Sequence, residues 1–235
     1  LVLVGTKLRP PHVRQQLVPR QRLLDRLNDG ADVRLTLLAT PAGFGKTSLL
    51  ASWFESAADQ RAMAWVSLDK GDNDPVVLWS YVVEALRRTC PDIGDSIASP
   101  APGARLVLEL LLPRLVNALD AHPGITLILD DFHVLGDGAA RDSLGWLVEQ
   151  APPSFQLVVA TRREPDLPLA RLRGHGDLLE LRADDLRFTF EECDDFLNTR
   201  QLLGLSDDDV RLLVTRTDGW PAGVYLAALS LRRAD

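Results

Sequence analysis

This chain of 235 residues has few cysteines and no long uninterrupted apolar run. Cys90 and Cys193 lie far apart and lack the close spacing of metal ligands, which argues against a disulfide framework and indicates a reducing compartment. No apolar span is long enough to cross a bilayer, and the first residues do not combine a basic segment with an apolar one as a signal peptide does. We therefore expect a cytoplasmic protein that does not contact membranes.

The chain also has fewer basic than acidic residues. Its 26 Lys and Arg residues and 33 Asp and Glu residues give a formal net charge of −7. Nucleic-acid-binding domains are usually basic, so we expect no direct DNA binding by this fragment. An anionic ligand should bring its own cation, as MgATP does. Internal repeats and low-complexity tracts are absent, and because the first residue is Leu1 we expect a piece of a longer protein.

What the sequence does contain is a phosphate-binding pattern between an apolar run, residues 33–39, and a helical pattern that begins near Lys46. Glycines at positions 43 and 45 let the backbone curl so that several N–H groups point at one anion, and the helix adds the positive end of its dipole. Lys46 would reach the β- and γ-phosphates, and the Thr47 hydroxyl would bind Mg²⁺. The nucleotide-binding residues predicted in this loop are Ala42, Gly43, Phe44, Gly45, Lys46, Thr47 and Ser48.

The loop departs from the usual pattern G-x-x-x-x-G-K-[ST], which places a glycine where this chain has Thr40. A β-branched residue at that position implies a negative φ, which the end of a strand tolerates, so we interpret the stretch as a variant phosphate loop. The alternative is an ordinary glycine-containing turn with an exposed lysine.

Residues 125–132 form a second informative run, an apolar strand that ends in Asp130 and Asp131. This is typical of a Walker B strand, in which Asp130 would hold Mg²⁺ through its water shell and Asp131 would polarise the attacking water. Asp131 is one methylene shorter than the glutamate often found there, which favours slow hydrolysis. The alternative is a buried strand with solvated acids at its tip. His133 follows, and a lone histidine after a strand is more often a packing residue than a site residue.

A further strand is predicted over residues 155–161, followed by Arg162 and Arg163. Ligands of open parallel sheets gather at the carboxyl ends of the strands, so a guanidinium at this point could sense a γ-phosphate. A surface salt bridge is an equally good interpretation of either arginine.

Periodicity, prolines and caps predict the other elements of the first part of the chain. Pro19 is predicted to open a helix that ends at Gly30, and Asp74 to cap a helix beginning at Pro75. Pro113 should kink or split a helical run. The remaining predicted elements are a helix from the phosphate loop to about residue 57, strands at 62–68 and 178–181, a loop at 90–103, and helices at 106–119 and 139–150.

From residue 187 the composition changes to polar helical segments. Their predicted start and stop signals are two capping boxes and a glycine before a proline: Thr189 with Glu192, Ser206 with Asp209, and Gly219 with Pro221. We therefore predict an α/β protein, a P-loop NTPase whose mainly parallel sheet is covered by helices on both faces. Residues 1–185 would form this nucleotide-binding domain with an N-terminal arm, and residues 186–235 a small helical lid domain, here truncated.

Seven segments carry a more specific signal: residues 17–20 (LVPR), 42–47 (AGFGKT), 65–69 (WVSLD), 71–75 (GDNDP), 130–133 (DDFH), 167–173 (LPLARLR) and 218–223 (DGWPAG). Together they resemble the ATPase module of the large MalT-like, LuxR-type bacterial regulators, which belong to the signal-transduction ATPases with numerous domains (STAND). The resemblance covers nearly the whole chain, and the later segments are much more specific than the phosphate loop.

The resemblance implies a nucleotide-operated switch, in which ADP holds a closed, inactive monomer and an inducer with ATP opens it for self-association. By position, it implies that Lys46 and Thr47 are the Walker A pair and that Asp130 and Asp131 are the Walker B pair. It also makes Arg162 the arginine that follows the sensor strand. The implied catalytic residues are thus Lys46, Asp131 and Arg162, and the implied Mg²⁺ ligands are Thr47 and Asp130.

Arg20 and Pro221 are the two implied site residues outside the Walker A and Walker B motifs and the sensor strand. The resemblance implies that Arg20 helps to hold the base and phosphates, and that Pro221 of the lid packs on adenine. An equally good interpretation of Pro221 is a favourable first residue of a helix. The helix-turn-helix that full-length family members carry at their far C-terminus is not in this chain.

The predicted function is therefore an ATP/ADP- and Mg²⁺-binding regulatory module with slow ATP hydrolysis, and transcriptional control follows only from the resemblance. Two alternatives stay open: a regulatory ATPase domain linked to a protein kinase, and a work-performing P-loop ATPase with fast turnover. An interaction domain with a vestigial loop is the weakest alternative, because the Walker A and Walker B side chains are all retained.

Overall fold

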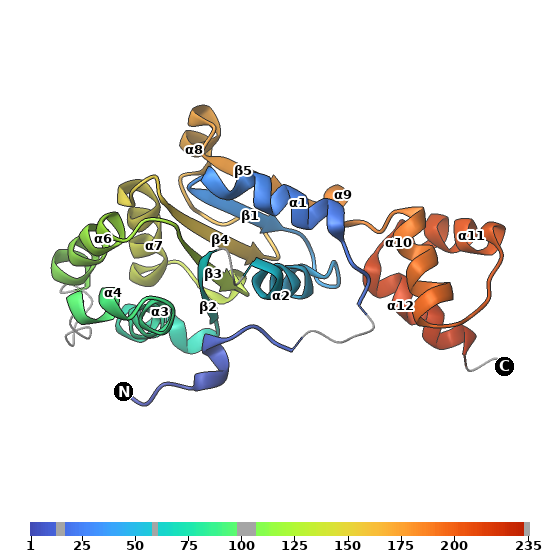
Figure 1. The fold of residues 1–235 in the computed structure, drawn as a ribbon, viewed down its shortest axis with the longest axis horizontal. Coiled ribbons are helices and arrows are strands. Elements are labelled where there is room, and N and C mark those ends of the chain that lie inside the picture. Colours follow the sequence, from blue (N-terminus) through green and yellow to red (C-terminus); the bar gives the residue numbers. More distant parts are fainter. Residues whose placement is uncertain (13–16, 58–60, 98–106, 233–235) are drawn as a thin grey trace.

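The computed structural model describes residues 1–12, 17–57, 61–97 and 107–232. These residues contain a five-stranded sheet in the order β2-β3-β4-β1-β5, and every pairing between its strands is parallel (Figure 1). The predicted α/β fold with a parallel sheet is thereby confirmed. The strands are β1 Leu35–Ala39, β2 Ala62–Ser67, β3 Ile125–Asp130, β4 Phe155–Thr161 and β5 Leu178–Leu181.

The central strands are apolar throughout because both faces of the sheet are covered. All six residues of β3 are buried, and Leu127 and Leu129 pack into one core while Ile128 packs into the other. Strands of parallel sheets commonly read as continuous apolar runs for this reason. The same covering leaves the carboxyl ends of the strands as the place where polar side chains emerge.

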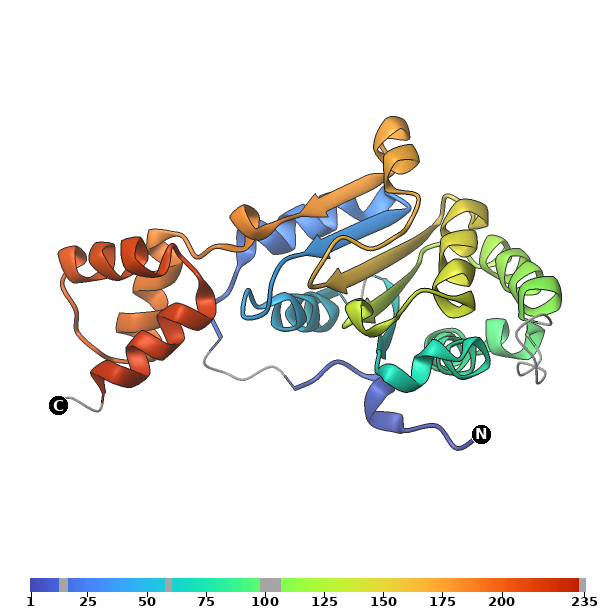
Figure 2. The ribbon, with the colours of Figure 1, turned by 180° about the vertical axis from the view of Figure 1, so that it is seen from behind.

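Two groups of helices cover the two faces of the sheet (Figures 1 and 2). On one face lie α1 Gln21–Asp29 and α2 Lys46–Ala57. On the other face lie α3 Pro75–Thr89, α4 Pro91–Ser96, α6 Leu112–Ala121, α7 Ala139–Gln150 and α8 Leu169–His175. Among the described residues, no helix combines the length and the apolarity needed to cross a membrane.

Several short helical turns join these elements. They are η1 Gly5–Leu8, η2 Gly30–Asp32, η3 Lys70–Asn73, η4 Val107–Leu111, η5 Phe132–Val134, α9 Ala183–Leu186 and η6 Asp195–Arg200. Of these, η1 belongs to the N-terminal arm and packs against β2, the edge strand of the sheet. The arm therefore lies beside the sheet before the chain reaches α1.

Two predicted boundaries need correction, and one predicted break is confirmed. The first helix begins at Gln21 and not at Pro19, because Arg20 has a non-helical backbone and directs its side chain to the lid. The predicted loop at 90–103 contains α4, whose start is favoured by Pro91 and whose Ile93 is buried in the core; residues 98–103 lie outside the described residues. The helical run around Pro113 is split into a π-helical turn, η4, and α6, as the proline suggested.

The C-terminal helices form a separate small unit beside the sheet (Figure 1). They are α10 Phe190–Asp194, α11 Asp207–Thr217 and α12 Pro221–Leu231, and they share a core around Leu197 and Val210. The capping boxes predicted at Thr189 and Ser206 are confirmed, and so is the helix start at Pro221. A division of the chain at residue 185 stays a prediction; Leu186 still packs into the core of the sheet.

Candidate functional site

The phosphate loop connects the carboxyl end of β1 to the first turn of α2. Gly43 and Gly45 both have a left-handed backbone, with φ of 84° and 78°, which side chains with a Cβ rarely adopt. Thr40 is buried, has no positive φ, and its N–H donates to the carbonyl oxygen of Thr161 at 3.2 Å. It therefore continues the strand, as expected for a variant first position.

Lys46 lies at the start of α2 and is only 9% exposed. Its Nζ donates to the carbonyl oxygens of Thr40 at 2.6 Å and Pro41 at 2.9 Å. Burial lowers the pKa of Lys46, and the nearby positive charge of Arg162 lowers it further, while Asp130 and Asp131 act in the opposite direction. The ammonium group thus lies within the loop and among the charges at the ends of β3 and β4.

The two acids at the end of β3 differ in environment. Asp130 is 3% exposed, and its Oδ1 accepts hydrogen bonds from the Thr47 hydroxyl at 3.1 Å and from the Asp131 N–H at 3.0 Å. Burial raises the pKa of Asp130 to about 6. The side chain of Asp131 is 47% exposed, and its backbone is left-handed with φ of 58°. One carboxylate is therefore held against Thr47, and the other is open to solvent.

His133 and Arg162 lie next to these acids. The Nδ1 of His133 is 3.7 Å from a carboxylate oxygen of Asp131, too long for a hydrogen bond. Burial lowers the pKa of His133, and the charge of Arg162 lowers it further. The charge of Arg162 lowers the pKa of Lys46 as well. The charge of Arg163 lowers the pKa of His133 more weakly and is not among the causes of the Lys46 shift. Of the two arginines after β4, Arg162 is the one whose charge acts on Lys46 of the phosphate loop.

A cavity of about 420 Å³ opens on the α2 side of the phosphate loop. Of the residues predicted to bind nucleotide, Arg20, Phe44, Gly45, Ser48 and Pro221 line it. The sequence prediction missed three of its apolar walls: Val18, Leu24 and Phe188. Its walls thus come from the segment before α1, from α2 and from the lid.

The lid also touches the phosphate loop directly. The indole N–H of Trp220 donates to the carbonyl oxygen of Ala42 at 3.2 Å, and the N–H of Ala222 donates to that of Gly43 at 3.1 Å. A Cβ on Gly43 would lie only 2.7 Å from the indole nitrogen of Trp220. Gly43 therefore allows the lid to sit close against the loop, besides supplying the left-handed turn.

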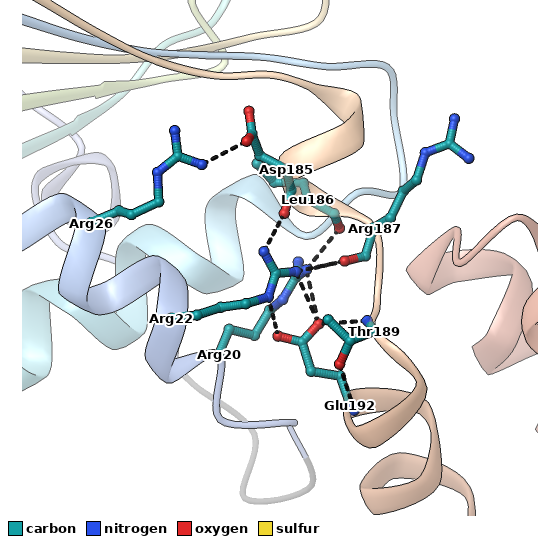
Figure 3. A network of polar contacts seen from close by, with 8 residues as sticks. All are labelled: Arg20, Arg22, Arg26, Asp185, Leu186, Arg187, Thr189 and Glu192. Carbon is teal, nitrogen blue, oxygen red and sulfur yellow. Dashed lines mark hydrogen bonds and ion pairs between the residues drawn. The ribbon is translucent and has the colours of Figure 1, made fainter.

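A network of arginines holds the lid to the segment around α1 (Figure 3). The Nη2 of Arg20 donates to the carbonyl oxygens of Leu186 and Arg187 and to Glu192 Oε2. Arg22 donates from Nε to the other carboxylate oxygen of Glu192 at 3.0 Å. Glu192 is 8% exposed and also accepts from the N–H of Thr189, so it is the shared acceptor of this junction.

Arg20 is not satisfied by this network alone. It is 7% exposed, and its Nε and Nη1 atoms are buried without a hydrogen-bond partner among the described residues. Burial lowers its pKa, and the charge of Glu192 offsets only part of that effect. A buried guanidinium with two unused donors on a cavity wall points to a ligand with acceptor atoms.

The chain is similar in sequence to known proteins. No family profile matches the chain. The serine/threonine-protein kinase PknK of Mycobacterium tuberculosis is 36% identical over 234 residues, which cover 97% of this chain and 21% of that protein. The HTH-type transcriptional regulator MalT of Yersinia enterocolitica is 34% identical over 234 residues, covering 99% of this chain and 26% of MalT.

Solved structures agree on the fold. A STAND protein with a tetratricopeptide repeat sensor from Pyrococcus horikoshii superposes with a TM-score of 0.61 at 17% identity, covering 90% of this chain and 30% of that one. Cdc6p from Pyrobaculum aerophilum gives a TM-score of 0.56 at 17% identity, covering 96% and 65%. By its sequence, the chain belongs to the MalT-like modules. The resemblance inferred from its motifs is thereby confirmed.

The chain spans about a quarter or less of the length of these curated relatives. Within this MalT-like module, local patterns could have suggested some of the missed site residues. Val18 precedes Arg20 in a segment that already carried the resemblance, and Trp220 stands next to Pro221. Glu192 was recognised only as a capping residue, since no local pattern shows that its carboxylate meets arginines about 170 residues away.

Proposed function

We propose that this MalT-like module binds an adenine nucleotide with Mg²⁺ and acts as a nucleotide-dependent switch that hydrolyses ATP slowly. The observation that carries the proposal is the cavity of about 420 Å³ shared by the phosphate loop, the segment before α1 and the lid. Its volume suits a small organic ligand, and its walls are mostly apolar with few polar groups, as in many cofactor sites.

The residues present fit such a ligand at both ends. A planar base would pack between Val18, Phe188 and Pro221, because these side chains offer apolar surface and Pro221 has no N–H to compete with. The unused donors of Arg20 would bind acceptor atoms of the ligand. The phosphates would meet the backbone N–H groups of the loop and Lys46, in place of the carbonyl oxygens that the ammonium group now contacts.

Thr47 and Asp130 would hold Mg²⁺, whose role is to neutralise charge that develops on the phosphates. Among the described residues, no three His, Cys, Asp or Glu side chains converge as metal ligands, so most of the coordination would come from phosphate and water. Asp131 is the candidate general base because it is half-exposed and borders the same cleft as Thr47 and Asp130. Arg162 and Lys46 would stabilise the transferred phosphoryl group.

The switch follows from the position of the lid. The lid contributes Phe188 and Pro221 to the cavity, and Trp220 contacts the phosphate loop. A nucleotide that binds the closed arrangement more tightly than an open one would therefore favour closure, by no more than that difference in affinity. In this proposal ADP holds the closed monomer, and ATP with an inducer opens it for self-association.

Calorimetric titration with ADP and Mg²⁺ tests the binding. The parent chain should bind, and Lys46→Ala should weaken affinity at least about tenfold, because no neighbouring group replaces the charge. Lys70→Ala, at an exposed lysine on η3, is the matched control and should bind as the parent chain does. Equal affinity in Lys46→Ala and the parent chain would remove the phosphate-loop assignment.

The relatives favour two effectors for the parent protein, since both PknK and MalT are similar over nearly all of this chain. We propose transcriptional control as the first and regulation of a linked serine/threonine kinase as the second. Purified parent protein separates them: ATP-dependent binding to a promoter fragment supports the first, and phosphorylation of a Ser/Thr peptide supports the second.

A further inference from the structure

The N-terminal arm is anchored beside the candidate site by a buried ion pair. Lys7 Nζ donates to both carboxylate oxygens of Asp72, at 2.8 and 2.6 Å, and to Asp69 at 3.1 Å. Asp72 is completely buried, and the ammonium also lies 4.1 Å from the ring centre of Tyr81. Because Lys7 and Asp72 are both shielded from solvent, whereas Asp69 is exposed, the Lys7–Asp72 contact fixes the arm more firmly than a surface ion pair would.

The residues on either side of Arg9 are fixed as well. Leu8 is 7% exposed and packs into the core on the α3 face of the sheet. Arg9 has an extended backbone, with φ of −151° and ψ of 149°, and the following Pro10 and Pro11 restrict the chain further. The position of Arg9 is therefore set by buried contacts before it and by stiff backbone after it.

A cleft of about 660 Å³ separates this part of the arm from the phosphate loop. Arg9 and His12 line it from the arm, and Thr47, Asp130 and Asp131 line it from the core, together with Glu55 of α2. Figures 1 and 2 both show the arm, in dark blue, passing α3 and β2 in the direction of the lid. Among the described residues, Arg9 has no hydrogen-bond or ion-pair partner, so its guanidinium is available to a ligand in the cleft.

The charges of this cleft suit a metal–phosphate pair. A bare phosphate would be repelled by Asp130 and Asp131, and a bare cation would be repelled by Arg9. A divalent cation on the side of the two acids, with phosphate oxygens turned to the arm, satisfies both. Arginine is well suited to the outer end of such a ligand because its planar fork can donate two hydrogen bonds to one phosphate.

We propose that Arg9, held in place by the Lys7–Asp72 ion pair, contacts the γ-phosphate of a bound nucleoside triphosphate and makes the site distinguish triphosphate from diphosphate. This inference rests on the nucleotide binding proposed above. Thr47 and Arg9 line the cleft but not the apolar cavity that would hold the base, although Glu55 borders both; Arg9 therefore contacts the end of the nucleotide that ADP lacks.

The test compares two ligands, ADP and a non-hydrolysable ATP analogue, each with Mg²⁺, by calorimetry. Arg9→Gln should weaken binding of the analogue about tenfold and leave ADP affinity within about twofold, because a charge-assisted hydrogen bond is lost only with the triphosphate. Arg171→Gln is the matched control, since Arg171 lies on α8, borders a pocket at the amino ends of the strands and is 61% exposed. It should change neither affinity.

A second variant tests the anchor. Lys7→Met combined with Asp72→Asn removes both charges without leaving one buried alone, and should reproduce the selective loss of analogue binding. Its melting temperature shows that it folds, and Arg9→Gln, at an exposed position, gives an independent result.

An unchanged ratio of the two affinities in Arg9→Gln overturns the inference, and so does an equal loss for both nucleotides, which would place Arg9 on the shared part of the ligand. If the parent chain binds neither nucleotide, the proposed function fails and this inference fails with it. That outcome is recognised in the parent chain before any variant is compared.

Discussion

The cavity beneath the lid and the cleft beneath the arm meet the same phosphate loop from two sides, and apart from Glu55, which borders both, different side chains line them. The first is walled by apolar groups such as Val18, Leu24 and Phe188, whereas the second is lined by Arg9 and the acids that end β3. Apolar walls suit the base, which ATP and ADP share. Charged walls suit the metal and the γ-phosphate, in which they differ.

The two sides also differ in what supports them. The apolar cavity is completed by the lid, which docks on the loop through Trp220 and on the arginine network through Glu192. The polar cleft is completed by the arm, which is anchored by Lys7. In our proposal, occupancy of the first side sets the angle of the lid, and the second side reports which nucleotide is bound.

The largest expected effect lies on the polar side. Asp131→Asn should lower the rate of ATP hydrolysis about 100-fold or more, as expected for loss of a general base, while Mg-nucleotide binding is kept. Single-turnover hydrolysis measures the rate. Asp120→Asn, at an exposed acid near the end of α6, is the control and should hydrolyse as the parent chain does. Hydrolysis at the parent rate in Asp131→Asn would show that Asp131 is not the base.

On the lid side, Gly43→Ala should weaken ADP binding by about tenfold or more, because the new methyl group would meet Trp220 and Ala222 at a left-handed position. Gly145→Ala is the matched control, since a Cβ at Gly145, inside α7, meets nothing within 4 Å. Calorimetry with ADP measures both variants. If Gly43→Ala binds ADP as well as Gly145→Ala does, close docking of the lid is not needed for affinity.

Asp130→Asn should make the nucleotide-free protein more stable, by about 1–3 kcal/mol, while weakening the Mg²⁺ dependence of binding. Burial raises the pKa of Asp130 to about 6, above the value of an unfolded aspartate, so the folded chain favours the neutral form. Both hydrogen bonds are accepted by Oδ1, an atom that asparagine keeps.

Because the pKa of Asp130 is higher in the folded chain than in the unfolded one, folding stability should rise as pH falls through 6 toward 4 and the carboxylate becomes neutral. Asp130→Asn should lack this rise. Thermal melts of both proteins between pH 7 and pH 5 measure it. A lower melting temperature for Asp130→Asn at pH 7 would contradict the assignment of Asp130 as a buried carboxylate whose charge destabilises the folded chain.

The smallest effect is expected for Pro221→Ala, which keeps the first turn of α12 but trims one wall of the cavity. ADP affinity should fall about threefold to tenfold, with the melting temperature of the nucleotide-free protein little changed. An equal loss of stability with ADP affinity intact would show that Pro221 serves only to start the helix.

Local patterns predicted much of the chain correctly. Helix α7 and strands β4 and β5 have the predicted bounds, and the capping boxes at Thr189 and Ser206 lie where the sequence indicated. These features depend on neighbours within a few residues: apolar periodicity, prolines that fix φ, and side chains that cap the nearest N–H groups. The phosphate loop is also local, since its curl depends on glycines two residues apart.

Only the tertiary structure shows which residues, distant in the sequence, contact each other. No spacing rule connects Lys7 with Asp72, Arg20 with Glu192, or Gly43 with Ala222 of the lid, because the partners are about 65 to 180 residues apart. From local sequence alone, an arginine before a helix, such as Arg20, is expected to be a surface charge, and only the fold shows that it is buried. The sequence by itself thus determined the helices, the strands and the chemistry of the phosphate loop. Only tertiary packing decided which charged side chains are buried and which of them line the two sides of that loop.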